Sequence, residues 1–209
     1  PQTINAYYDP TTNEICFPAG ILQAPFFDPA ADDAANYGAI GVVIGHEMTH
    51  GFDDQGSQFD KEGNLRNWWT PQDKANFKAR TERMVRFFDA IEVLPGLHCN
   101  GALTCGENIA DHGGLKVAYQ AFRNATARNP LPKFEGFTPD QRFFISYAQV
   151  WANNIRPEAL RNQVKTDPHA PGRWRVNGAL PQIDAWYNAF GIKKGDKLFV
   201  PKNKRVDVW

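Results

Sequence analysis

The segment GHEMTHG at residues 45–51 restricts what this chain can fold into more than any other stretch. Residues four apart in a helix project from one face, so His46 and His50 can direct both imidazoles at one metal ion, with Glu47 beside them as a base. With five His and eight Glu in 209 residues, chance produces such a pattern in about 1 chain in 200. The alternative is a pair of core histidines hydrogen-bonded to the backbone of a buried helix.

Two histidines supply only half of a tetrahedral site, so a third protein ligand must lie elsewhere in the chain. The metzincin spacing is excluded, because Asp53 and Gly56 occupy the positions where that pattern has glycine and histidine. A glutamate at the spacing of thermolysin-like sites would fall near Trp69 or Thr70, and neither residue binds zinc.

The stretch GENIADHGG at residues 106–114 supplies a suitable carboxylate. Glu107 and Asp111 are four apart, so one helical face presents both of them. We predict that Glu107 is the third ligand and that Asp111 accepts the free N–H of a metal-bound imidazole. An ordinary solvated acidic face is the alternative for this pair.

Two of the other three histidines, His98 and His112, are interpreted as non-ligands. His98 lies in a Pro-Gly loop, and His112 points away from Asp111 on the same helix. A second zinc site from His98 with Cys99 and Cys105 would lack a fourth ligand of usual spacing. Cys16, Cys99 and Cys105 form no CxxC pair, and both a Cys99–Cys105 bridge, suited to an oxidising compartment, and three free buried thiols stay open.

The pattern around these motifs is mainly helical. Residues 36–54 predict a buried helix of about four or five turns that carries the histidines. Further helices are predicted from residue 70 to a stop at 95–96, over 106–127, from 138 through 154, from 157, and from 181 to a C-terminal cap at Gly191. The β-favouring clusters INAYY, EICF and ILQAPFF in the first 30 residues predict a small ribbon of short strands and turns.

Composition excludes several classes of partner. Lys+Arg and Asp+Glu balance at 23 each, and no long run of residues of like charge occurs. The sequence therefore does not indicate a basic surface for nucleic acid or an anionic membrane. The longest apolar run, AIGVVIG at 39–45, is far too short to cross a bilayer. The start has neither a signal peptide nor an initiating Met, so we interpret the chain as a processed or excised piece.

Six blocks of sequence stand in one order over nearly the whole chain: NAYY at 5–8, FPAGILQAPFFD at 17–28, VVIGHEMTHGFDDQG at 42–56, GENIADHGGL at 106–115, DPHAPGRWR at 167–175, and Val-Trp at 208–209. This series resembles the neprilysin-like zinc metallopeptidases, which include endothelin-converting enzymes and bacterial oligopeptidases. The resemblance implies the C-terminal part of a thermolysin-like zincin domain, of the gluzincin type. Members of that family are much longer than this chain.

The resemblance also implies roles for individual residues. One zinc ion would be bound by His46, His50 and Glu107, with Glu47 as the base and Asp111 orienting a zinc histidine. The other implied roles are stabilisation of the transition-state oxyanion by His169, binding of a substrate carbonyl by Arg175, pairing of Asn5 and Ala6 with the peptide main chain, and support of a ligand by Asp53.

One departure concerns the C-terminus. Many animal members end in Cys-x-Val-Trp, whereas Val206 stands at that Cys position here, which favours a bacterial type. We expect one catalytic segment, with a substrate-binding ribbon at 1–30, zinc-binding helices at 36–127, and C-terminal helices with a substrate-binding loop at 138–209.

The predicted function is a zinc endopeptidase or oligopeptidase that hydrolyses peptide bonds with metal-activated water. The resemblance implies cleavage on the amino side of apolar residues and the need for an N-terminal portion, either in the same polypeptide or as a companion chain. The alternative from another class is a non-catalytic, zinc-stabilised module for peptide binding or scaffolding. A third possibility is a segment that folds poorly alone, because its apolar stripes expect partner helices.

Overall fold

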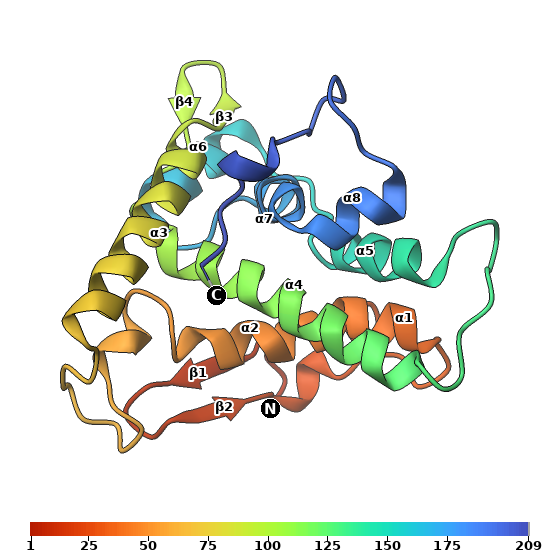
Figure 1. The fold of residues 1–209 in the computed structure, drawn as a ribbon, viewed down its shortest axis with the longest axis horizontal. Coiled ribbons are helices and arrows are strands. Elements are labelled where there is room, and N and C mark those ends of the chain that lie inside the picture. Colours follow the sequence, from red (N-terminus) through yellow and green to blue (C-terminus); the bar gives the residue numbers. More distant parts are fainter. Residues whose placement is uncertain (209) are drawn as a thin grey trace.

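A long helix, α4 (Cys105–Thr126), is the element around which the others are arranged. In this computed structural model, which describes residues 1–208, α4 crosses the middle of the molecule, with α2 (Val42–His50) and a small ribbon below it in the view of Figure 1 and α7 (Gly172–Ala179) and α8 (Asp184–Phe190) above it. The other helices are α1 (Asp33–Asn36), α3 (Pro71–Asp89), α5 (Pro139–Val150) and α6 (Pro157–Thr166).

The strands form two short antiparallel ribbons. The first pairs β1 (Tyr7–Asp9) with β2 (Glu14–Cys16), and Tyr8 lies opposite Ile15. The second pairs β3 (Glu92–Leu94) with β4 (Leu97–His98). The described residues are thus mainly α-helical with small β-ribbons, which confirms the predicted fold class.

The helix that carries the HExxH pattern packs very closely against α4. A π-helical turn at Tyr37–Gly41 joins α1 to α2. A Cβ added at Gly45 would lie 2.9 Å from the Cα atom of Gly114, and one added at Gly114 would lie 2.7 Å from the backbone nitrogen of His46. Side chains at these two positions would force the helices apart, so the glycines are what brings α4 within reach of the histidines.

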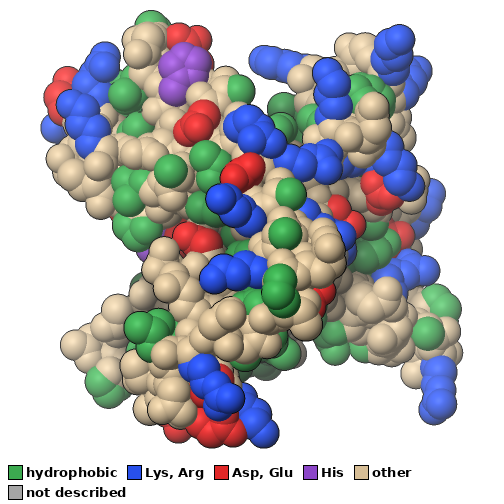
Figure 2. All heavy atoms as spheres, turned by 60° about the vertical axis from the view of Figure 1, so that its left-hand side comes forward, with side chains coloured by type: hydrophobic (Ala, Val, Ile, Leu, Met, Phe, Trp, Pro, Cys, Tyr) green, Lys and Arg blue, Asp and Glu red, His purple; other side chains and the backbone are tan. Residues whose placement is uncertain are grey.

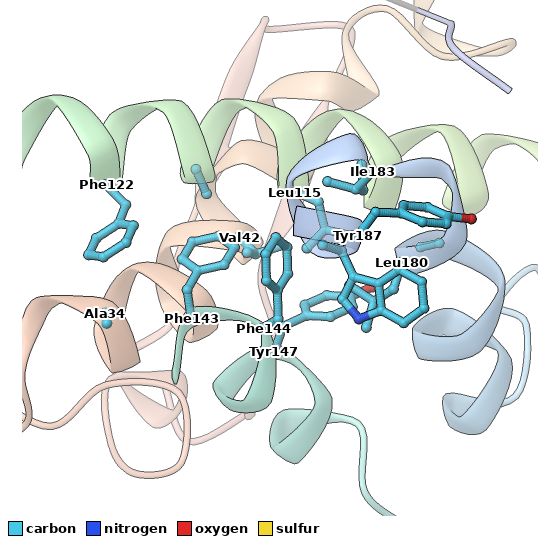
Figure 3. Packing of buried hydrophobic residues seen from close by; sticks show 13 residues of the cluster. Ala34, Val42, Leu115, Phe122, Phe143, Phe144, Tyr147, Leu180, Ile183 and Tyr187 are labelled. Atoms are coloured by element: carbon cyan, nitrogen blue, oxygen red, sulfur yellow. The ribbon is translucent and has the colours of Figure 1, made fainter. Parts of the chain in front are cut away.

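The largest core cluster fills the space between α4, α5 and α8, and Figure 3 shows its aromatic side chains interleaved. The rings of Phe122 and Phe143 stack with centroids 5.6 Å apart, while Phe143 and Phe144 meet edge to face at 5.1 Å. All three are buried. Aromatic side chains of this size contribute a large share of the buried apolar area, so this cluster anchors α5 firmly to α4.

A second core cluster joins α3, the start of α4 and the C-terminal tail. Met84 and Phe88 of α3 pack in it with Ile109 of α4 and with Val206 and Val208 of the tail. The tail is also held by hydrogen bonds from α3, since Arg80 donates to the carbonyl of Val208 at 3.0 Å and Arg83 to that of Arg205 at 3.2 Å.

The surface matches the balanced composition. On the face shown in Figure 2, Lys and Arg side chains are interspersed with Asp and Glu, and hydrophobic side chains lie among them. Within residues 1–208, no helix combines the length and the apolar character that crossing a membrane requires.

Several secondary-structure predictions were wrong in detail. The ILQAPFF cluster forms no strand and begins instead within a 3-10 turn at Ala19–Ile21. The helix predicted from residue 70 begins correctly, with Thr70 accepting a hydrogen bond from the backbone N–H of Asp73, but it ends at Asp89. The Pro-Gly pair at 95–96 is the turn of the β3–β4 ribbon, because Gly96 adopts a positive φ of 73°.

Two further differences lie in the C-terminal half. Pro181 opens no helix but sits in a 3-10 turn at Leu180–Gln182, and α8 starts at Asp184 and ends at the predicted Gly191 cap, whose φ is 63°. The helix α7 was not predicted, since its sequence GRWRVNGA has no capping side chain and little apolar periodicity. Cys99 and Cys105 are free and buried, and Cys16 is free and partly exposed.

Candidate metal centre

Three side chains from two helices converge at one point. His46 and His50 project from the same face of α2, and Glu107 reaches them from the first turn of α4. The Nε2 atom of His46 lies 3.2 Å from Glu107 Oε2, and that of His50 lies 3.5 Å from Glu107 Oε1. Their donor atoms all lie within 4.8 Å of one another. This is the set that the sequence predicted.

The opposite nitrogen of each imidazole is held by a carboxylate. His46 Nδ1 lies 2.9 Å from Asp111 Oδ1, and His50 Nδ1 lies 2.7 Å from Asp53 Oδ2. The other Asp53 oxygen accepts backbone N–H groups of Gln55 and Gly56 at 2.8 and 2.7 Å. A carboxylate partner at Nδ1 fixes the tautomer that turns Nε2 toward the centre.

Glu107 provides a test of whether a metal fits here. Its Oε2 atom is buried and makes no hydrogen bond of good geometry, despite its closeness to His46. Burial would raise the pKa of Glu107, but the contact with His46 and the charge of Arg175 outweigh it and lower that pKa to about 2. One oxygen of the ionised carboxylate thus lacks a hydrogen-bond partner, and together with the two imidazoles the carboxylate forms a set of ligands that suits zinc.

Glu47 lies on the cavity side of α2 and is buried, with 5% of its surface exposed. Burial raises the pKa of Glu47, although the neighbouring histidines oppose the shift. A carboxylate whose pKa is raised in this way holds a proton more readily, as a general base near neutral pH requires.

His169 comes from the loop between α6 and α7. Its Nε2 atom lies 3.3 Å from Glu107 Oε2, and its Nδ1 atom lies 2.8 Å from Asp167 Oδ1. Asp167 therefore orients the ring of His169 just as Asp53 orients that of His50. Sequence reasoning missed Asp167, although its place two residues before His169 was a usable signal.

Arg175 is buried behind the centre. Its Nε and Nη2 atoms donate to the two oxygens of Asp111 at 2.8 and 2.6 Å, and its guanidinium lies over the ring of Trp151 at 3.7 Å. Burial by itself would raise the pKa of Asp111, but the charge of Arg175 and the contact with His46 hold it well below its usual range. A continuous chain thus runs from Arg175 through Asp111 to His46.

These residues line a cavity of about 420 Å³. Asn5 and Ala6 lie at its edge, just before strand β1 begins, and Asn5 is exposed. The apolar part of the wall comes from Ile21, Phe26, Val43 and Val150, among others. The cavity therefore combines the charged groups of the metal centre with apolar wall residues, the composition typical of a ligand site.

The remaining histidines lie outside the cluster, as predicted. His98 is exposed and its Nδ1 atom contacts the carbonyl of Asp89 at 3.1 Å. His112 is buried with neither ring nitrogen hydrogen-bonded, and its Nε2 atom lies 4.0 Å from Asp207 Oδ1. Burial, together with the charge of Lys116, lowers the pKa of His112 to about 4.

The buried His112 is expected to make stability depend on pH. Its folded pKa of about 4 lies below the unfolded value of about 6.5, so the unfolded chain binds more protons between these values and stability falls as the pH drops through this window. The substitution His112→Gln should remove on the order of 2–3 kcal/mol of this loss. Urea unfolding at about pH 7 and pH 4.5 measures the change in the free energy of unfolding between the two pH values. The control His98→Gln, at an exposed site, should show the same change as the parent. If the parent and His112→Gln lost equal stability between the two pH values, His112 would not be the source of the pH dependence.

Comparison with known proteins yields one family. Residues 5–206 match the profile of peptidase family M13. The chain is 48% identical to an endothelin-converting enzyme homolog of Locusta migratoria over its whole length, covering 29% of that protein, and 46% identical to human endothelin-converting enzyme 1, covering 27%. The crystal structure of the Mycobacterium tuberculosis zinc metalloprotease Zmp1 in complex with an inhibitor superposes with a TM-score of 0.96 at 47% identity, over 99% of this chain and 32% of that one.

These relatives come from animals and bacteria at similar identities, so they do not favour the bacterial type that Val206 suggested. The chain spans less than a third of the length of each relative.

Proposed function

The chain belongs to peptidase family M13, and we propose that it is the zinc-binding catalytic segment of an endopeptidase. The family assignment confirms the resemblance drawn from the sequence motifs. The convergence of His46, His50 and Glu107 within 4.8 Å carries the proposal, because these are the nitrogen and carboxylate donors of catalytic zinc sites that leave one position open.

In this proposal the three residues hold one zinc ion. When bound, zinc supplies Lewis acidity that activates a water molecule and polarises the peptide carbonyl. Asp111 and Asp53 keep the two imidazoles in the tautomer that binds metal, through their contacts of 2.9 and 2.7 Å. Their roles are therefore to position ligands rather than to touch the substrate.

Glu47 is the proposed general base. It takes a proton from the attacking water and later gives it to the leaving amine, so one carboxylate acts in both halves of the reaction. Its burial at the cavity wall supports this role. No covalent intermediate is required, because the proposed attack on the carbonyl is by water.

His169 and Arg175 are proposed to bind the reacting peptide. His169, whose Nδ1 is oriented by Asp167 at 2.8 Å, can donate from Nε2 when both ring nitrogens carry protons. The acceptor is the oxygen that becomes negative in the transition state, where one such donor contributes roughly 3–4 kcal/mol. Arg175 would bind a substrate carbonyl, and Asn5 and Ala6 would pair with the peptide main chain at the cavity edge.

The substrate preference is proposed from the cavity wall. Its apolar side chains, including Phe26, Val43 and Val150, suit an apolar residue on the carboxyl side of the cleaved bond. Because the chain spans only 27–29% of the length of the curated relatives quoted above, we propose that activity requires a further N-terminal portion, in the same polypeptide or as a companion chain. The segment itself would act as one unit, with the ribbon, zinc helices and C-terminal helices in the order expected from the sequence.

Elemental analysis combined with native mass spectrometry and a peptide-hydrolysis assay tests the proposal. We expect one zinc ion per chain and hydrolysis that a chelator abolishes, in the preparation that contains any companion polypeptide. A chain that binds zinc but hydrolyses no peptide with its companion present would indicate a zinc-stabilised binding module instead. A purified chain without affinity for zinc would overturn both functions.

A further inference from the structure

Tyr147 of α5 is a core residue that also reaches the metal centre. Its ring packs within the largest core cluster, where Figure 3 places it beside Phe144. The residue is one of those that line the cavity, and it is 1% exposed. Its hydroxyl donates to the backbone carbonyl of Arg175 at 3.0 Å. The hydroxyl therefore links the rigid core to the residue that holds Asp111.

Two residues at the C-terminal end of α5 hold Arg175. Tyr147 lies in the last turn of α5, and Trp151 is the residue that caps the helix at its C-terminus. Tyr147 binds the backbone carbonyl of Arg175, while the ring of Trp151 covers its guanidinium at 3.7 Å. A Cβ added at Gly172 would lie 2.5 Å from the Trp151 carbonyl, which shows how closely the start of α7 approaches α5.

The start of α7 packs against both core clusters, through Trp174 and Val176, but it has no side-chain cap. Pro171 precedes it and provides no side-chain cap, so hydrogen bonds from other elements matter more for its position. Burial, and then the negative charge of Asp111, raise the pKa of Tyr147 well above its usual value. The phenol is therefore protonated at neutral pH and can act as a donor.

A phenylalanine at this position would fill the same space in the core. The hydroxyl contributes no apolar packing, and its burial is favourable only because it is hydrogen-bonded. The contribution specific to the hydroxyl is therefore its hydrogen bond to the backbone of Arg175.

We propose that Tyr147 is a positioning residue that acts through Arg175 on the zinc site. By fixing the Arg175 backbone, it sets where the guanidinium meets Asp111 and Glu107, at 2.6 and 3.6 Å from Nη2. Asp111 in turn orients His46. This inference rests on the proposed function, because it requires that zinc binds at His46, His50 and Glu107.

The test is a zinc-affinity measurement by chelator competition on the purified protein, with urea unfolding in parallel. We expect Tyr147→Phe to weaken zinc binding on the order of 3–10-fold, somewhat less than the 10–100-fold typical of a partner that touches the ligand directly. The matched control is Tyr187→Phe. Tyr187 belongs to the same cluster, and its hydroxyl donates to the Pro181 carbonyl at 2.9 Å, but it does not line the cavity of the metal centre. The control should lose stability yet keep zinc affinity within about 2-fold.

A second comparison separates positioning from general destabilisation. In an Arg175→Lys background, Tyr147→Phe should change zinc affinity less than about 2-fold, since its effect passes through the guanidinium. The inference is overturned if Tyr147→Phe binds zinc like the parent, if Tyr187→Phe weakens zinc binding equally, or if the effect is undiminished beside Arg175→Lys. A parent that binds no zinc would instead overturn the proposed function and, with it, the basis of this inference.

Discussion

The substitution Glu47→Gln is expected to lower the rate of peptide hydrolysis by roughly 10²–10⁴-fold while zinc stays bound. The amide has nearly the shape of the carboxylate but cannot accept a proton from water, so the proton transfer is lost and the metal ligands are left in place. Glu47 is not one of the three converging donors, which is why the two effects should separate. The measurements are kcat/KM on a fluorogenic peptide and zinc content per chain.

Stability provides an internal check on this prediction. Burial raises the pKa of Glu47, so the ionised carboxylate is disfavoured there and a neutral glutamine should leave the melting temperature unchanged or slightly higher. The control is Glu82→Gln on the exposed face of α3, which should keep full activity. Hydrolysis at the parent rate by Glu47→Gln would show that another group takes the proton.

The metal centre was predictable from sequence because its geometry is mostly local. A four-residue spacing on one helix fixes the directions of His46 and His50, and the same spacing fixes Glu107 and Asp111 on another. Only the packing of the two helices against each other had to be inferred. That inference followed because two histidines need a third ligand to form a zinc site. The close approach at Gly45 and Gly114 is the physical means by which the chain achieves it.

The parts that could not be predicted depend on contacts between distant segments. The helix α7 has weak signals of its own, and the position of Arg175 depends on Tyr147 in the last turn of α5 and on Trp151 just after it. Nothing in the local sequence of α5 distinguishes Tyr147 from the core aromatics around it. Turn chemistry explains the error at Pro181, because a proline near the start of the element fits a 3-10 turn as well as an α-helix.

A graded loss of zinc affinity should distinguish residues that bind the metal from residues that orient its ligands. Glu107→Gln replaces the carboxylate that lies 3.2 and 3.5 Å from the two imidazole nitrogens, and we expect its zinc affinity to fall by more than about 100-fold. Asp53→Asn removes the negative charge behind His50 and should cost about 10–100-fold, as lost outer contacts of metal ligands do. The exposed control Glu82→Gln should bind zinc like the parent.

The order of these effects follows from the chemistry of each position. An amide is a poor zinc ligand compared with a carboxylate, so Glu107→Gln leaves two imidazoles that cannot complete the site. Asp53→Asn keeps all three donors and perturbs only the basicity and orientation of one imidazole. Chelator competition at fixed pH measures all four proteins on one scale, with circular dichroism to verify that each is folded. If Glu107→Gln retained zinc affinity within about 3-fold of the parent, the carboxylate would not be a ligand, and the position of α4 beside α2 would have to serve another purpose.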